Sequence, residues 1–265
     1  MKLLLYKIKF ALAIGLVICS HNPVQAESNR STLIQNLRLR RQLNSPIFAA
    51  PKPPKGTGQP GRRDKAGSRG CDRGTNISSN VKKRFAALVP FYSKSELVYG
   101  VTSKPYPSLS FYIPYKSDIA YGEFVLEDEE TENQQIYKVA LTETPGIVNL
   151  QLSSGRVPLQ IGKQQRWYFN IYCKDDNRII ANLEGDIKRE QIKSALESQL
   201  ETATPTEKIK LYGAKGFWFE ALNNAIQVRR SNPRDTSLQK LLQEIGLKDV
   251  ANEPIVDCCK LQKEE

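Results

Sequence analysis

The sequence predicts an α+β protein: an antiparallel β-sandwich of immunoglobulin-like size, preceded by a disordered basic N-terminal tail and followed by a C-terminal helical bundle. Three observations lead to this. Strand-like alternation fills the middle of the chain, helical spacing of apolar residues follows it, and a stretch rich in Pro, Gly and cations precedes both. Strands followed by helices are typical of α+β proteins. The expected boundaries are 1–26 for a signal peptide, 27–80 for the tail, 81–187 for the sandwich and 188–259 for the helical part packed on it.

The first 26 residues have the features of a secretory signal peptide. Residues 1–10 carry three lysines and no acid, the apolar run ALAIGLVICS follows, and VQA at 24–26 offers small residues where signal peptidase reads the chain. The run is too short for a stable membrane anchor, which needs about 20 apolar residues. We expect cleavage after Ala26 and a periplasmic or secreted protein with no transmembrane segment left. An uncleaved anchor and lipidation at Cys19 are the alternatives.

Cleavage would change the chemistry that the chain can perform. The one histidine, His21, lies inside the predicted signal peptide, so the mature chain would contain no imidazole. This excludes Ser-His-Asp and Cys-His catalysis and every histidine-containing metal site. The formal net charge of +11 would fall to about +8 with the loss of the three lysines.

The tail at 27–80 has a composition that cannot form a core. It holds eleven Lys and Arg residues against three acids, and its centre reads APKPPKGTGQPGRRDKAGSRG. Such a segment cannot offset the entropy cost of its own ordering, which predicts disorder. A basic tail could bind nucleic acid, anionic lipopolysaccharide or an acidic polysaccharide, and export favours the last two. A plain solvated linker is the alternative.

Four cysteines remain after signal removal: Cys71, Cys173, Cys258 and Cys259. An even number in an exported chain indicates disulfides. A bond between the adjacent Cys258 and Cys259 would be strained. We therefore expect Cys71 and Cys173 each to pair with one of the two C-terminal cysteines, in an order that stays open, so that Cys71 fastens the tail to the folded part. One disulfide with two free thiols is the alternative, and a zinc site is disfavoured because no CxxC pair exists.

The strands are predicted from alternation of apolar and polar residues, as in SLSFYIPY and RWYFNIYC. Spacings of about 10–15 residues, with the turn sequences ETPG and KDDN between them, indicate an antiparallel sandwich or barrel. The expected strands are 108–115, 120–127, 135–142, 146–153, 166–173 and 178–186.

Helical periodicity replaces alternation from about residue 188. The expected helices are one over about 188–200, one at 206–214 opened by Pro205, one at 216–230, and one at 238–245 ended by Gly246.

Three tyrosines are candidates for a ligand platform. Tyr112, Tyr168 and Tyr172 lie on the side of their strands opposite the main apolar residues. If exposed, their rings could form an aromatic surface for sugars. The alternative is that helices cover this second face.

The carboxylates form three groups: 127–130, Asp175 with Asp176, and Glu184 with Asp186. A glycosidase would need two carboxyl groups facing each other across a cleft. Each group lies at a predicted strand end or turn, where solvated charges are common. We assign no catalytic residue, no metal ligand and no cofactor.

An ordered set of segments carries a family resemblance: GSRGC, ALVP, SFYIPY, EFVLEDE, PGIVNLQL, WYFNIYC, YGAKGFWFEALNNAIQVRRSNP, LLQEIGL and PIVDC. Together they resemble a family of cyanobacterial secreted proteins known as a domain of unknown function, number nine hundred twenty-eight in that series. The resemblance covers about residues 60–259 and departs at Cys259, an extra cysteine beside the expected one. It implies export and a compact domain, and it carries no catalytic residue to this chain.

These observations favour an exported, non-enzymatic binding or accessory module of the cell envelope. Its expected partner is an anionic envelope polysaccharide or another envelope protein, and not a nucleic acid. The alternatives are a carboxylate-dependent polysaccharide hydrolase, and a structural partner of an outer-membrane or secretion system, which would expose a contiguous apolar patch.

Overall fold

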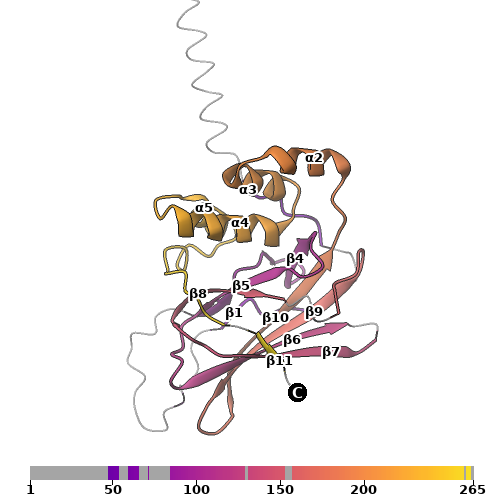
Figure 1. Ribbon diagram of the computed structural model, residues 1–265. Coiled ribbons are helices and arrows are strands. Elements are labelled where there is room, and N and C mark those ends of the chain that lie inside the picture. Colours follow the sequence, from indigo (N-terminus) through magenta and orange to yellow (C-terminus); the bar gives the residue numbers. More distant parts are fainter. Residues whose placement is uncertain are drawn as a thin grey trace, which may run out of the picture. The chain divides into compact units, whose positions relative to one another are not determined.

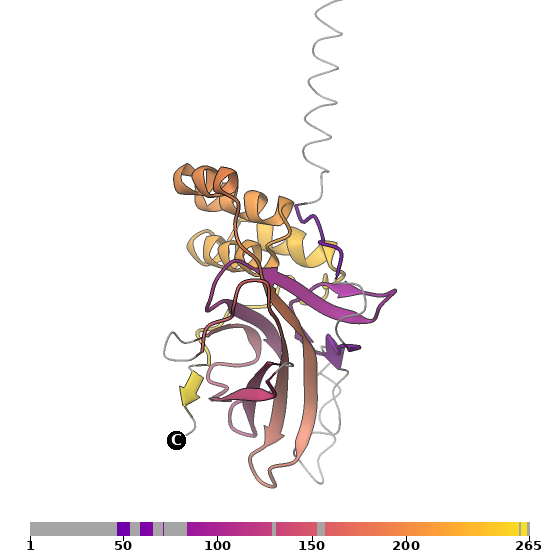
Figure 2. The ribbon, with the colours of Figure 1, turned by 90° about the vertical axis from the view of Figure 1, so that its right-hand side faces the viewer.

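The computed structural model describes residues 47–53, 59–65, 71, 84–128, 131–152, 157–259 and 261–263. The predicted signal peptide and Cys19 lie outside these residues. The described part is mostly β-sheet, with two sheets and four helices near the C-terminus, and the helices lie together at one end of the strands (Figure 1; Figure 2 gives a view turned by 90°).

The strands and helices have the following bounds. The strands are β1 (Asp64–Lys65), β2 (Phe85–Ala87), β3 (Phe91–Tyr92), β4 (Leu97–Thr102), β5 (Ser108–Ile113), β6 (Ala120–Asp128), β7 (Asn133–Val139), β8 (Gly146–Gln151), β9 (Gln164–Cys173), β10 (Ile179–Arg189) and β11 (Leu261–Lys263). The helices are α2 (Ser194–Thr202), α3 (Pro205–Ala214), α4 (Trp218–Ser231) and α5 (Ser237–Glu244).

The larger sheet has seven strands in the order β11-β7-β6-β9-β10-β4-β3, and the smaller has four in the order β1-β2-β5-β8. Strand pairs are antiparallel except β10 with β4, which is parallel. In β9 the alternation is as the sequence predicts, because Trp167, Phe169, Ile171 and Cys173 are all fully buried. The predictions of strands at β5 to β10 are confirmed.

Aromatic side chains join the two sheets. The ring of Phe111 on β5 lies 4.6 Å from that of Phe169 and 5.7 Å from that of Trp167, both on β9. Phe85 on β2 lies 5.4 Å from Phe169. These pairs meet edge to face, which is the favourable geometry for aromatic quadrupoles. The apolar core therefore lies between β5 and β9, and the opposite side of β9 points away from it.

Helix α4 is anchored to the strands by its first turn. The indole nitrogen of Trp218 donates to the carbonyl of Leu88 at 2.8 Å. Glu220 is buried, and its Oε1 accepts from the Thr102 hydroxyl at 2.6 Å and from the Ser103 amide at 2.8 Å. Its Oε2 is also buried and has no hydrogen-bond partner among the residues that the structure describes. The end of β4 and the turn after it thus supply hydrogen-bond donors to one oxygen of the buried Glu220 carboxylate.

The four helices confirm the prediction from periodicity, with one shift at the first. Strand β10 continues to Arg189, and α2 begins only at Ser194 rather than near 188. Helix α3 begins as its sequence indicates, because Pro205 occupies its first turn and Thr204 and Glu207 form a reciprocal capping box.

Strand β4 was not predicted. All six of its residues, LVYGVT, are buried, so its sequence shows no apolar–polar alternation. Strands covered on both faces lack the period-2 signal on which the prediction depends.

Two stretches inside the segment expected to be disordered pack on the folded part. The amides of Ile47 and Phe48 donate to the carboxylate of Glu244 at 2.7 and 2.9 Å, and the Phe48 ring lies 4.7 Å from that of Trp218. The expected tail therefore does not extend over 47–53, because backbone amides and one aromatic ring find partners on the helices.

The second stretch, residues 59–65, is called the strap here. The amide of Gly61 donates to the carbonyl of Glu96 at 2.9 Å, and Arg62 and Glu184 exchange two backbone hydrogen bonds. Two residues later, β1 pairs with β2 of the smaller sheet. The strap therefore bonds to both sheets. Its composition predicts disorder because composition reports only the hydrophobicity of side chains. The strap is ordered by backbone hydrogen bonds, which composition does not report.

Candidate functional site

The face of the seven-stranded sheet that points away from the core carries the best candidate site, and it is called the polar face here. On β6, β9 and β10 its residues stand in register: Tyr121 beside Tyr172 and Ile179, Glu123 beside Asn170 and Asn182, and Glu127 beside Arg166 and Asp186. Every second residue of β9 from Tyr168 to Tyr172 is half-buried here, between fully buried core residues. The strands therefore hold aromatic, amide and charged groups in fixed rows.

A stacked pair of tyrosines forms one end of the polar face. The rings of Tyr121 and Tyr172 lie 5.1 Å apart and nearly parallel, at 9°. The Tyr172 hydroxyl donates to Glu123 Oε1 at 3.0 Å, and the Asn170 amide donates to the same oxygen at 3.3 Å. Burial and the neighbouring Glu123 carboxylate together raise the pKa of Tyr172 to about 12. The phenol is therefore neutral near pH 7 and acts as a hydrogen-bonding group.

An arginine cluster lies farther along the same strands. The guanidinium of Arg166 contacts Glu184 Oε2 at 3.2 Å and Asp186 Oδ1 at 3.3 Å. It also donates to the strap carbonyls of Gln59 at 3.1 Å and Pro60 at 2.9 Å. Burial alone would lower the pKa of Arg166, but the two carboxylates raise it above its usual value. The cluster thus fastens the strap to the sheet.

Tyr168 lies between the tyrosine pair and the arginine cluster. The Arg166 guanidinium carbon is 5.7 Å from the centre of its ring, within the range of a cation–π contact. Burial and a hydrogen bond to Glu127 raise the pKa of Tyr168. Tyr168 and Tyr172 therefore share one face, as the strand pattern predicted.

Tyr112 does not join them. It lies on β5 of the smaller sheet and is only 4% exposed. Burial and the nearby Glu253 raise its pKa to about 12. The structure thus brings together two of the three predicted platform residues, and it adds Tyr121 from β6. Alternation along β6 puts Tyr121 and Glu123 on the side opposite Phe124, and the register between β6 and β9 shows which residues they meet.

The cysteines pair differently from the prediction. Cys71 is bonded to Cys173, with 5.3 Å between their Cα atoms. The expectation that each of them pairs with a C-terminal cysteine is therefore wrong. Cys173 ends β9 deep in the core and is within reach of Cys71, which the sequence alone could not show.

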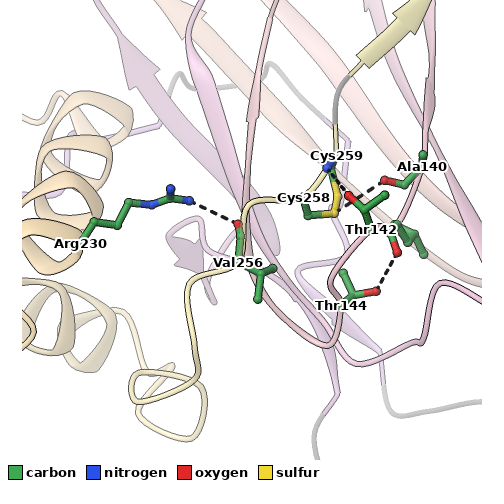
Figure 3. The surroundings of a disulfide bond; sticks show 8 residues. Ala140, Thr142, Thr144, Arg230, Val256, Cys258 and Cys259 are labelled. Carbon is green, nitrogen blue, oxygen red and sulfur yellow. Dashed lines mark hydrogen bonds between the residues drawn. A yellow bond between two sulfur atoms is a disulfide. The ribbon is translucent and has the colours of Figure 1, made fainter.

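The two C-terminal cysteines, Cys258 and Cys259, are joined to each other (Figure 3). The Cys259 amide donates to the hydroxyl of Thr142 at 3.4 Å, and the Cys258 sulfur lies 3.7 Å from the carbonyl oxygen of Ala140. Both contacts are with the segment after β7 and hold the C-terminal segment against it.

Two of the three predicted carboxylate groups meet around Arg166, where Glu127 from the first group lies beside it in register, and the third group lies apart in the turn after β9. Glu184 and Asp186 are bound to Arg166, while Asp176 pairs with Arg178 in the turn after β9. Glu127 accepts from Gln134 at 3.4 Å across the β6–β7 pair. Residues 129–130 lie outside the described part of the chain.

The described residues carry neither a cluster of metal ligands nor a membrane-spanning helix. Across those ranges, no three His, Cys, Asp or Glu side chains gather as metal ligands would. Among the same residues, no helix is long and apolar enough to cross a membrane.

Comparison with known proteins identifies the family. Residues 64–255 match the family described as Domain of Unknown Function (DUF928), which is more than half of the chain, so the chain belongs to this family. No curated protein and no solved structure matches it. The matched range contains the polar face and all four helices, whereas 47–53 and the first residues of the strap precede it.

Proposed function

We propose that this member of the DUF928 family is an exported, non-enzymatic binding module of the cell envelope, and that the polar face is its binding surface. The observation that carries the proposal is the Tyr121–Tyr172 pair, half-exposed beside Glu123 and Asn170 on neighbouring strands. Rings with an apolar body and a polar edge are favoured where a protein meets a ligand. Groups fixed on strands bind with little loss of conformational entropy.

Export is part of the proposal and has two supports. The first 26 residues read as a signal peptide, and the Cys71–Cys173 disulfide is of the kind that persists in oxidising compartments. We also propose that the two sheets form the expected β-sandwich, with the helices as a small bundle packed on it. The aromatic contacts between β5 and β9 support this arrangement.

The arginine cluster favours binding over hydrolysis. A glycosidase needs one carboxyl group to donate a proton and another to act as base or nucleophile. Glu184 and Asp186 both contact the guanidinium of Arg166, which also bonds to the strap. This arrangement suits a structural clamp better than an acid–base pair.

The test begins with the protein as the cell makes it. We expect the mature chain to start after Ala26, and non-reducing peptide mapping to recover Cys71 linked to Cys173. The mature protein should sediment with isolated cell envelopes, and the double variant Tyr121→Ala/Tyr172→Ala should not. Phe91→Ala is the matched control, because Phe91 is an aromatic residue 40% exposed on the edge strand β3.

Two outcomes would contradict the proposal. A native chain that still begins at Met1 and has free thiols would show that the protein is not exported. Equal envelope association of the wild type and the double variant would show that the polar face is not the binding surface.

A further inference from the structure

We propose that the polar face binds an extended, uncharged glycan chain that runs along β9 from Tyr172 towards Tyr168. This inference rests on the proposed function and names the ligand class of the same surface. It departs from the anionic polysaccharide that the basic tail suggested.

The spacing of the aromatic residues requires an extended ligand. Tyr168 and Tyr172 are four residues apart on one strand and point to the same side, which separates them by about 13 Å. A single sugar ring is shorter than this distance. A ligand that contacts both rings must therefore be an oligomer, with a middle unit over Asn170.

The polar groups between the rings match hydroxyl groups. Asn170 and Asn182 stand side by side in register, and each side-chain amide has two donor hydrogens and an acceptor oxygen. The Asn182 oxygen accepts from Arg62 at 2.6 Å, and the Asn170 nitrogen donates one hydrogen to Glu123, so each amide keeps further bonding capacity. Glu123 accepts from Asn170 and Tyr172 through Oε1, so a carboxylate already held in place adjoins the rings. A sugar hydroxyl, which also donates and accepts, can bond to such a set without bringing a charge.

Apolar side chains border the tyrosine end of this row. Ile179 is paired with Tyr172 across β9 and β10 and is 51% exposed. Ile119, in the turn just before β6 and two residues before Tyr121, is 37% exposed. The C–H face of a sugar ring can cover these groups while its hydroxyls reach the amides.

The charges of the polar face disfavour a polyanion. Glu123 stands beside Lys138, and Arg166 is shared by Glu184 and Asp186, so the positive charges here already have acidic neighbours. Glu127, which the Tyr168 hydroxyl contacts, adds a further negative charge. The strap adds one more cation, because the Arg62 guanidinium donates to the Asn182 side chain at 2.6 Å. The carboxylates of Glu123, Glu127, Glu184 and Asp186 still outnumber the cations of Lys138, Arg166 and Arg62 among these residues. An anionic chain would therefore meet repulsion that an uncharged chain does not.

The experiment measures binding of defined oligosaccharides to the mature, disulfide-bonded protein by isothermal titration calorimetry. The probes are neutral hexasaccharides of glucose, xylose and N-acetylglucosamine, the matching disaccharides, and hexagalacturonate as the anionic chain. We expect at least one neutral hexasaccharide to bind about tenfold more tightly than its disaccharide and than hexagalacturonate.

The variants locate the site. Tyr168→Ala and Tyr172→Ala should each lower the association constant for the hexasaccharide about tenfold, because each removes one aromatic contact. Phe91→Ala should leave it unchanged, and thermal unfolding of each variant shows whether it is folded. Tyr172→Phe keeps the ring and should retain most of the affinity, even where Tyr172→Ala lowers stability.

The outcomes separate this inference from the proposed function. Tighter binding of hexagalacturonate, equal binding of disaccharide and hexasaccharide, or binding unaffected by both alanine variants would overturn the inference. Absence of oligosaccharide binding would also overturn it; if envelope association still depended on Tyr121 and Tyr172, the proposed function would stand with another ligand.

Discussion

Replacement of Arg166 by methionine tests the cluster that joins the strap to the polar face. Methionine keeps much of the length of the side chain but removes the guanidinium. Asp186, which is 1% exposed, would then stay buried without the guanidinium of Arg166. The carbonyls of Gln59 and Pro60 would lose their donor as well.

The structure sets the expected magnitude. Removing one partner of a buried ion pair costs about 3–5 kcal/mol, because the remaining charge stays out of water. For a folded part of this size, 1 kcal/mol shifts the midpoint of thermal unfolding by about 2–4 °C. We therefore expect Arg166→Met to lower that midpoint by roughly 6–20 °C. The strap should open first, because it loses two hydrogen bonds directly.

Two assays and two comparison variants check this. Urea unfolding measures the stability change, and trypsin cleavage after Arg62 or Arg63 reports opening of the strap. Arg178→Met is the matched control, because Arg178 forms an exposed ion pair with Asp176 that is worth about 0.2–1 kcal/mol. Adding Asp186→Asn to Arg166→Met should recover part of the loss by removing the buried charge that Arg166 balances in the wild type.

The reasoning is refuted if Arg166→Met costs no more than Arg178→Met. It is also refuted if trypsin cleaves the strap at the wild-type rate in a folded Arg166→Met variant.

Three further predictions follow from buried groups. Glu220→Ala should cost about 2–3 kcal/mol in urea unfolding, because the donors after β4 lose a charged acceptor; a loss below about 0.5 kcal/mol would contradict this. Gly185→Ala should cost about 1–3 kcal/mol, because its Cβ would lie 2.5 Å from the Trp167 ring, and an unchanged denaturation midpoint would argue against that close packing. Burial raises the pKa of Tyr92 and Tyr115 to about 12, above the value near 10 of an unfolded chain, so their contribution to stability is complete below pH 10 and lost between pH 10 and 12. Unfolding measured from pH 8 to 12 should show the decline begin near pH 10, and a flat profile to pH 12 would be inconsistent with it.

The sequence predicted strands well where apolar and polar residues alternate along the chain. Strands β5 to β10 alternate in this way, and the helices repeat their apolar residues every three or four positions. Strand β5 keeps this alternation in its sequence although all six of its residues are buried. The pattern of apolar and polar residues does not reveal β4, whose sequence LVYGVT does not alternate. It does not reveal the strap either, because backbone hydrogen bonds order that stretch. It also failed for the disulfide, because no local pattern shows that Cys71 reaches Cys173 rather than the C-terminus.

The candidate site required the register of the strands. Alternation placed Tyr168 and Tyr172 on one side of β9 and Tyr121 on one side of β6, and only the pairing of Tyr121 with Tyr172 brings these positions together. The same alternation also suggested Tyr112 for the platform, but this side chain is buried. It lies on the side of β5 opposite the main apolar residues, and that side is covered near Glu253 in the C-terminal part of the chain. Periodicity therefore identifies which side of a strand a residue occupies, while the topology decides whether that side meets solvent. A tyrosine pattern becomes evidence for a binding surface only when the segments packed over that side of the strand are known. Here Tyr168 and Tyr172 on β9 stay partly exposed, whereas Tyr112 on β5 is buried.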